Sequence, residues 1–412
     1  MIAFWLAAAS AAAGSASGAC PLGLFQSPDG HERVVITAPQ SDNFRYMYSD
    51  GRRGNVVAPD SPFKCSDGIL ADRSSPSRPW APIALRLSQT KFESHRTSLS
   101  GTLIEAEGGP RPLVVMVHGS ERTSPMTSAY PYIFASYGLS VFAYDKRGTG
   151  RSEGEYTQNF ELLADDAAAA LAAARRLAEG RYTRAGFFGG SQGGWVAPLA
   201  ATRSPADYVA VGFGLIASPL EEDREQVLSE MRELGYGGAD LAAAGEVADA
   251  TGKLVESHFT SGFEQLAGVK RRHGSKPWFG KVKGEFTGAM LKESDADLRR
   301  VGRSLYDNLE LIWDYDAPAV IRRLKVPQLW VLAEADREAP SDTSLTELKR
   351  LRAEGANLAI YSFPGTDHGM VEFTQAPDGS RTYTRITDGY FRMLADWIKG
   401  APPSAYGRAR QH

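Results

Sequence analysis

The sequence from Arg184 to Arg203 reads RAGFFGGSQGGWVAPLAATR. Its apolar run at 185–188 predicts a buried strand, and the Ala- and Leu-rich part that begins after Gly193 predicts a helix. Between them, GGSQG at 189–193 matches Gly-x-Ser-x-Gly, the pattern that holds a serine on a sharp turn between strand and helix. Glycines at both ends of the pattern let the strand and the helix approach closely, so the hydroxyl of Ser191 should project from the sheet. Ser191 is therefore the candidate nucleophile.

Predicted strands and helices alternate on both sides of this stretch. The strands are expected at 99–105, 113–117, 139–143, 185–188, 209–215, 328–333 and 358–363, and the helices at 130–137, 159–179 and 388–399. Such alternation is typical of an α/β fold with a doubly wound, mostly parallel sheet. The alternation stops at 220–316, a charged and largely helical segment. An insertion there would lie above the strand ends as a lid.

The chain divides into six expected segments. They are a signal peptide at 1–19, a small β-rich extension at 20–97, the first part of the sheet core at 98–219, a helical lid insertion at 220–316, the second part of the core at 317–400 and a disordered tail at 401–412. Pro198 lies within the helix expected after Ser191, where it should cause a bend or a short first segment because it lacks an N–H group.

The first nineteen residues are apolar or small, which is typical of a cleaved signal peptide and predicts a secreted or periplasmic protein. No Lys or Arg precedes the apolar run, so a mis-assigned start or an Ala- and Ser-rich leader is an alternative. The run is too short to cross a bilayer, and no stable membrane insertion is expected. Cys20 would follow the cleavage point and could carry a lipid anchor. Cys20 and Cys65 could equally form a disulfide or leave a free thiol at Cys65.

The charge balance excludes one class of partner. The 412 residues include 46 basic and 49 acidic side chains, for a net charge of -3, and no long run of Lys or Arg occurs. A nucleic-acid partner is therefore not expected. The two cysteines cannot form a metal site by themselves.

A serine nucleophile needs a base and an acid that orients the base. His368 lies in the loop PGTDHGM at 364–370, which follows the last expected strand. Asp336 follows the strand at 328–333, at the sheet edge where such folds gather functional residues. Glu334 and Glu338 are neighbouring alternatives for the acid. The order along the chain is nucleophile, acid, base.

Two backbone N–H groups are expected to stabilise the oxyanion that forms when the serine attacks. One belongs to Gln192, at the start of the helix after Ser191. The other belongs to Ser120, in the His118-Gly119-Ser120 loop that follows the strand at 113–117. For His118 itself a structural or oxyanion-loop role is expected.

Five motifs occur in the order found in a known superfamily. They are Val117–Ser120, Tyr144–Ser152, Gly189–Gly193, Asp336 and Asp367–Gly369. Together they resemble the α/β-hydrolase superfamily, and within it the chain is most similar to bacterial secreted esterases and serine-aminopeptidase-like hydrolases. The resemblance implies a Ser-Asp-His triad, an acyl-enzyme intermediate, and neither metal nor cofactor. It also implies that Asp145 and Arg147 brace a loop.

The leading hypothesis is a serine hydrolase that cleaves a small carboxylic ester. An exopeptidase or amidase that acts on short peptides with the same triad is the alternative, and it would need a carboxylate near the lid to bind the substrate amine. Glu221, Glu222 and Asp223 are candidates by position. A binding module without catalysis is the third hypothesis, although such proteins usually lack a triad member.

Overall fold

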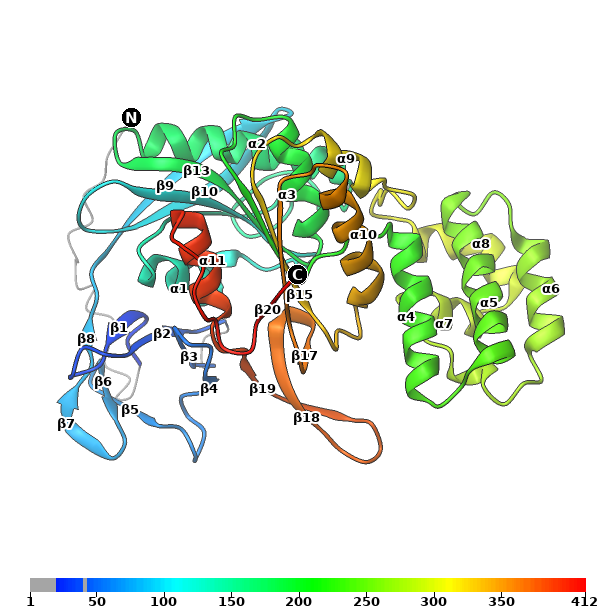
Figure 1. Cartoon of the computed structure of the whole chain (residues 1–412), viewed down its shortest axis with the longest axis horizontal. Coiled ribbons are helices and arrows are strands. Elements are labelled where there is room, and N and C mark those ends of the chain that lie inside the picture. Colours follow the sequence, from blue (N-terminus) through cyan, green and yellow to red (C-terminus); the bar gives the residue numbers. More distant parts are fainter. Residues whose placement is uncertain (1–19, 40–42) are drawn as a thin grey trace.

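The computed structural model describes residues 20–39 and 43–412, so the expected signal peptide at 1–19 lies outside the described residues. Its centre is a nine-stranded sheet with the order β20-β16-β15-β14-β13-β11-β12-β10-β9 (Figure 1). The strands are β9 Leu85–Ser94, β10 Thr97–Ala106, β11 Arg111–Val117, β12 Ser140–Tyr144, β13 Tyr182–Gly190, β14 Val209–Gly212, β15 Gln328–Ala333, β16 Leu358–Phe363 and β20 Arg410–Gln411. The pairs between β12 and β16 are parallel, and the edge pairs are antiparallel. The predicted fold class is confirmed.

Helices cover both faces of this sheet. They are α1 Tyr130–Ser136, α2 Phe160–Leu177, α3 Gly193–Thr202, α9 Ala317–Arg323, α10 Ser341–Ala353 and α11 Tyr390–Lys399. Successive strand residues point to opposite faces, so Val115 packs into the core under α2 and α3 while Val114 packs into the core under α1 and α11. This burial on both faces explains the continuous apolar runs of the central strands.

Helix α3 runs as one ten-residue element with Pro198 inside it. The expected short first segment is therefore wrong. Pro198 is buried and its helix continues to Thr202, so packing of the apolar helix against the sheet outweighs the lost backbone hydrogen bond.

The N-terminal extension consists of short antiparallel strands, as expected. They are β1 Gly23–Gln26, β2 Arg33–Thr37, β3 Arg45–Tyr48, β4 Arg53–Asn55, β5 Phe63–Ser66, β6 Ile69–Asp72, β7 Ser75–Pro79 and β8 Ala81–Pro82. The extension ends near residue 84 rather than 97, because β9 already pairs with β10 along its whole length. A disulfide joins Cys20 to Cys65, so the free-thiol alternative is wrong, and the sulfur that a lipid anchor would need is bonded.

The insertion is helical, with α4 Pro219–Glu233, α5 Gly238–Glu256, α6 Phe263–His273, α7 Thr287–Lys292 and α8 Asp295–Tyr306. These helices form a group beside the sheet, next to α10 (Figure 1), and share their own apolar core around Val247, Trp278 and Met290. None of the helices in the described ranges is long and apolar enough to cross a membrane.

The segment at 401–412, expected to be disordered, is ordered, and that expectation is wrong. Tyr406 is buried, and β20 pairs with Tyr361 and Ser362 of β16. Ion pairs of Arg408 with Glu372 and of Arg410 with Glu334 add to this strand pairing.

Candidate active site

Ser191 lies on a strained turn between β13 and α3. Its φ is +52°, a left-handed conformation that is unfavourable for a side chain other than glycine. The flanking glycines are required because a side chain at either position would clash with backbone atoms. A Cβ on Gly189 would lie 2.1 Å from the Gly193 oxygen, and one on Gly193 would lie 2.2 Å from the Val117 oxygen. The turn therefore presents the Ser191 hydroxyl beyond the carboxyl end of the sheet.

The structure brings the three candidate triad residues together. The Nε2 atom of His368 lies 3.0 Å from the Oγ of Ser191, and its Nδ1 atom lies 3.0 Å from an Asp336 carboxylate oxygen. The other Asp336 oxygen accepts hydrogen bonds from the backbone N–H groups of Glu338 and Ala339. This geometry allows a proton to pass from the serine to an imidazole whose orientation a buried carboxylate fixes.

Neither of the two alternative acids contacts the Nδ1 atom of His368. Glu334 accepts a hydrogen bond from Ser362 at 2.6 Å and pairs with Arg410, away from His368. Glu338 lies on the opposite side of the imidazole from Asp336, with an oxygen 3.6 Å from the Nε2 atom that faces Ser191. Only Asp336 of the three contacts Nδ1, the nitrogen that the orienting acid must hold.

The surroundings of His368 favour its protonated form. Burial by itself lowers the pKa of His368, but the hydrogen bond and the charge of Asp336 outweigh it, and the charges of Glu338 and Asp367 add to this effect, so the pKa rises to about 9. Burial raises the pKa of Asp336, against the hydrogen bond from His368. A general base must be neutral to accept a proton, so the raised pKa of His368 bears directly on any reaction that uses it as the base.

We therefore expect kcat/KM to rise with pH up to about 9, as His368 loses its proton. Glu338→Gln removes a charge that stabilises the imidazolium, so the inflection should move to lower pH and the rate at neutral pH should rise by roughly 3- to 10-fold. The measurement is kcat/KM for a non-ionising ester from about pH 5 to 10. A flat profile, or a shift towards higher pH in the variant, would contradict this expectation.

Asp367 connects the loops that carry the acid and the base. One of its oxygens accepts from the backbone N–H groups of Arg337 at 2.9 Å and His368 at 2.8 Å. The other pairs with Arg381 at 2.5 Å and accepts from the Tyr383 hydroxyl. Burial would raise the pKa of Asp367, but these hydrogen bonds lower it, so the carboxylate stays charged. The pattern Asp367-His-Gly was visible in the sequence, whereas nothing in the sequence indicated Arg381.

Phe213 is a further neighbour of the base that the sequence did not indicate. It follows β14 with a φ of +43°, and its ring meets the His368 ring edge-on with centroids 5.2 Å apart. The strained backbone and the aromatic contact together restrict the position of the imidazole.

The loop after β11 lies against the nucleophile. A Cβ on Gly119 would lie 2.8 Å from a Glu121 carboxylate oxygen and 3.2 Å from the Ser191 Cβ, so a larger residue would crowd both side chains. Within the described ranges, the backbone N–H groups of Ser120 and Gln192 donate to no other residue, which leaves both donors available. The imidazole of His118 points to Glu121, with 3.1 Å between Nδ1 and the carboxylate, and is not part of the triad.

Among the three carboxylates considered as amine ligands, two have structural roles. Glu221 completes the capping box of α4 with Ser218. Asp223 is fully buried and accepts from the backbone N–H groups of Phe286 and Thr287 and from the Thr287 hydroxyl. Glu222 has no such partner among residues 20–39 and 43–412, and burial, with the charges of Glu285 and Glu338, raises its pKa well above its usual range.

Glu285 also lies near the base and was not indicated by the sequence. Burial and the charges of Glu338 and Asp223 raise its pKa to about 7, while the charge of His368 lowers it. Glu222, Glu285 and Glu338 come from three different segments. The charge of Glu338 raises the pKa of the other two, so the three carboxyl groups lie close enough to interact.

The motif at 144–152 braces the adjoining loop, as the resemblance implied. Arg147 makes a buried, two-pronged ion pair with Asp166 of α2 at 2.5 and 2.7 Å. Asp145 accepts from the backbone N–H of Arg151 at 2.9 Å. Such a pair fixes the loop in one position because separating two buried charges is costly.

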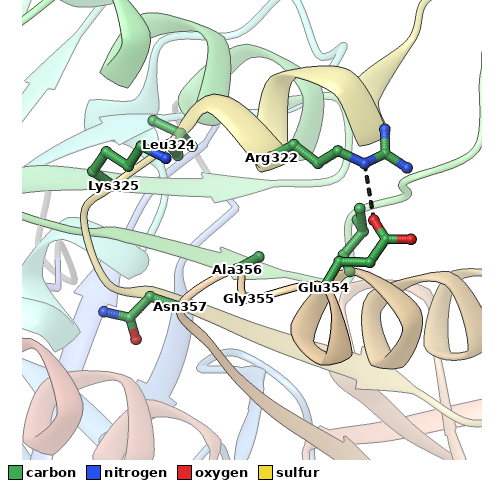
Figure 2. A pocket seen from close by; sticks show the side chains of 8 residues that line it. Arg322, Leu324, Lys325, Glu354, Gly355, Ala356 and Asn357 are labelled. Carbon is green, nitrogen blue, oxygen red and sulfur yellow. Dashed lines mark hydrogen bonds and ion pairs between the residues drawn. The ribbon is translucent and has the colours of Figure 1, made fainter.

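A surface hollow of about 380 Å³ lies at the opposite end of the sheet, where the chain enters β15 and β16 (Figure 2). Arg322 and Glu354 pair across it at 3.0 Å, and none of the triad residues lines it. In the described part of the chain, no group of three or more His, Cys, Asp or Glu side chains could hold a metal ion.

Comparison with known proteins matched one family model to part of the chain. Residues 108–236 match the family model described as "Serine aminopeptidase, S33". The search of curated proteins gave no match.

Similar solved structures include two esterases and a peptidase. The Pyrococcus furiosus esterase Pf2001 is 14% identical, with a TM-score of 0.43 over 69% of this chain and 84% of that chain. The Pyrobaculum calidifontis esterase is 18% identical, with a TM-score of 0.41 over 70% and 78%. The Pyrococcus horikoshii acylaminoacyl peptidase is 17% identical, with a TM-score of 0.47 over 91% of this chain and 49% of that chain.

Proposed function

We propose that this chain, an α/β-hydrolase by its fold, is a serine hydrolase that cleaves small carboxylic esters. The observation that carries the proposal is the hydrogen-bonded row Ser191, His368 and Asp336, in which both contacts of the imidazole measure 3.0 Å. The family model that matches residues 108–236 supports a hydrolase as well.

The reaction follows from this geometry in two halves. The Ser191 oxygen attacks the ester carbonyl while His368 takes the hydroxyl proton, and the carbonyl oxygen becomes an anion facing the N–H groups of Ser120 and Gln192. The anion collapses, the alcohol leaves with the proton from His368, and an acyl-enzyme forms. Water then repeats the sequence, so that the acid product is released and Ser191 is restored.

A fluorophosphonate probe is expected to label Ser191 and to abolish turnover of p-nitrophenyl acetate or butyrate. The labelled peptide is identified by mass spectrometry, with heat-unfolded protein as the control that should not react. Full turnover after complete labelling, or a label on another serine, would contradict the assignment. A folded protein that neither reacts nor turns over any ester would favour the third hypothesis, a binding module without catalysis.

A serine aminopeptidase is the second candidate, and the carboxylates beside His368 favour it. The charges of Glu285 and Glu338 raise the pKa of Glu222, and the charge of Glu338 raises the pKa of Glu285, so a substrate ammonium group would relieve repulsion at this cluster. Asp223 serves this candidate indirectly, because it holds the segment that carries Glu285.

If this candidate is right, Glu222→Gln and Glu285→Gln should each raise KM for an aminoacyl p-nitroanilide by roughly 10-fold, the effect of one lost charged hydrogen bond. KM for the N-acetylated substrate, which lacks the ammonium group, should hardly change. Equal effects on both substrates would argue against an amine site. Ester turnover more than about tenfold above amide turnover, with no preference for the free amine, would leave the esterase as the better description.

We also propose that the chain functions outside the cytoplasm. The Cys20–Cys65 disulfide supports this, because such bonds persist in oxidising compartments and are rare in the cytosol. It fits the leader-like composition of residues 1–19.

A further inference from the structure

Lys146 is a buried cation that the triad chemistry does not use. It follows β12 in the braced motif at 144–152, and only 3% of its surface is exposed. Its ammonium group donates to the Gly119 carbonyl oxygen at 2.5 Å, lies 3.5 Å from the Gln192 side-chain oxygen, and stands 5.1 Å from the centre of the Tyr156 ring. The ammonium therefore contacts the loop of one expected oxyanion donor and the residue that carries the other.

The contact of Lys146 with the Gly119 carbonyl also fixes the orientation of the whole Gly119–Ser120 peptide. In a trans peptide the C=O and the next N–H point in opposite directions, so holding the Gly119 oxygen sets the direction of the Ser120 N–H. The Gly119 residue is also the one that packs on Ser191. The peptide that Lys146 holds thus begins at the residue that packs on the nucleophile.

A second side chain holds the following peptide. The Tyr156 hydroxyl donates to the Ser120 carbonyl oxygen at 2.5 Å, and Arg122 lies over the Tyr156 ring at 4.3 Å. Both carbonyls that flank the Ser120 N–H are therefore tied to the segment that follows β12, whose position the Arg147–Asp166 pair fixes.

Burying a charged amine costs free energy unless hydrogen bonds or ion pairs compensate for the lost water. Burial lowers the pKa of Lys146 to about 8, with Glu121 raising it and Arg122 lowering it. A lysine that served only to fill this space could be replaced by an apolar side chain at no such cost.

We propose that Lys146 is a positioning residue, which with Tyr156 orients the Gly119–Ser120 peptide so that the Ser120 N–H can stabilise the oxyanion. The proposal rests on the proposed serine hydrolase function. The oxyanion contact exists in the transition state and only weakly in the bound substrate. The effect of Lys146 should therefore fall on kcat and not on KM.

The test compares Lys146→Met, Lys146→Arg and Tyr156→Phe with the wild type on a p-nitrophenyl ester. We expect Lys146→Met to lower kcat by roughly 10- to 100-fold, part of the loss seen when an oxyanion donor is removed, with KM changed by less than about twofold. The inhibition constant of a trifluoromethyl ketone, whose adduct with the serine carries an oxyanion, should rise by the same factor as kcat falls. Lys146→Arg should recover part of the loss, and Tyr156→Phe should lower kcat by roughly 3- to 10-fold with the same selectivity.

Rates are corrected for the fraction of active sites titrated with a fluorophosphonate, and Lys349→Met on the exposed face of α10 is the matched control. Unchanged kcat in Lys146→Met, or equal changes in kcat and in the titrated fraction, would overturn the proposal. Should Lys146→Met fail to fold, unchanged kcat in Tyr156→Phe would overturn it instead. A wild type that neither reacts with the probe nor turns over esters would overturn the proposed function rather than this inference.

Discussion

Ser191→Ala and His368→Ala are each expected to lower kcat for ester hydrolysis by about 10⁶-fold, the loss typical of a nucleophile or base that acts as part of a triad. The reason is geometric. The Nε2 atom of His368 lies 3.0 Å from the Ser191 oxygen. In the described part of the chain, no other hydroxyl forms a hydrogen bond with this nitrogen. The double variant should be hardly slower than either single variant, because each change alone already prevents the proton transfer.

The measurement is kcat for p-nitrophenyl butyrate, with Ser304→Ala as the control, an exposed serine on α8 far along the chain from the site. Circular dichroism of each variant checks that the fold is intact. A Ser191→Ala protein with more than about one tenth of the wild-type kcat would remove Ser191 from the mechanism.

Asp336→Asn is expected to lower kcat by roughly 10⁴-fold while leaving the fold in place. The asparagine amide can donate to Nδ1 of His368, which would place the imidazole proton on Nε2, where it blocks acceptance of the serine proton. Asp336 is well suited to its role because the backbone N–H groups of Glu338 and Ala339 hold the carboxylate in place.

Glu334→Gln is the matched control, since Glu334 lies two residues away along the chain and contacts Ser362 and Arg410. It should retain kcat within about twofold. If Glu334→Gln lost as much activity as Asp336→Asn, the acid would have been assigned to the wrong carboxylate. The same comparison with Glu338→Gln separates the orienting acid from the residue that only raises the pKa of the base.

The order of strands and helices along the chain could be predicted because each element has a local sequence pattern. The central strands are buried on both faces, so they appear in the sequence as continuous apolar runs such as Leu113–Val117. Glycine is required on both sides of Ser191 because a Cβ there would lie about 2 Å from a neighbouring backbone oxygen. The loop positions of Asp336 and His368 followed from strand ends that a parallel sheet gathers at one edge.

The features that the sequence did not indicate depend on contacts between distant segments. Arg381 reaches Asp367 from β19 Arg381–Ile386, and Glu285 approaches His368 from the insertion, so no local pattern contains either pair. The segment at 401–412 is held by pairing with β16 and by ion pairs of Arg408 and Arg410 with distant residues. Apolar residues recur along the chain with the period of a helix or strand, whereas polar contacts between distant segments have no such period.

The end of α4 carries a consequence for substrate entry. Glu233 pairs with Arg337 at 2.7 Å and with Arg381 at 3.4 Å, and both arginines belong to the network around Asp367. An outward movement of the insertion would have to break these two ion pairs. We therefore expect raised ionic strength, which screens partly exposed charges, to make such a movement easier.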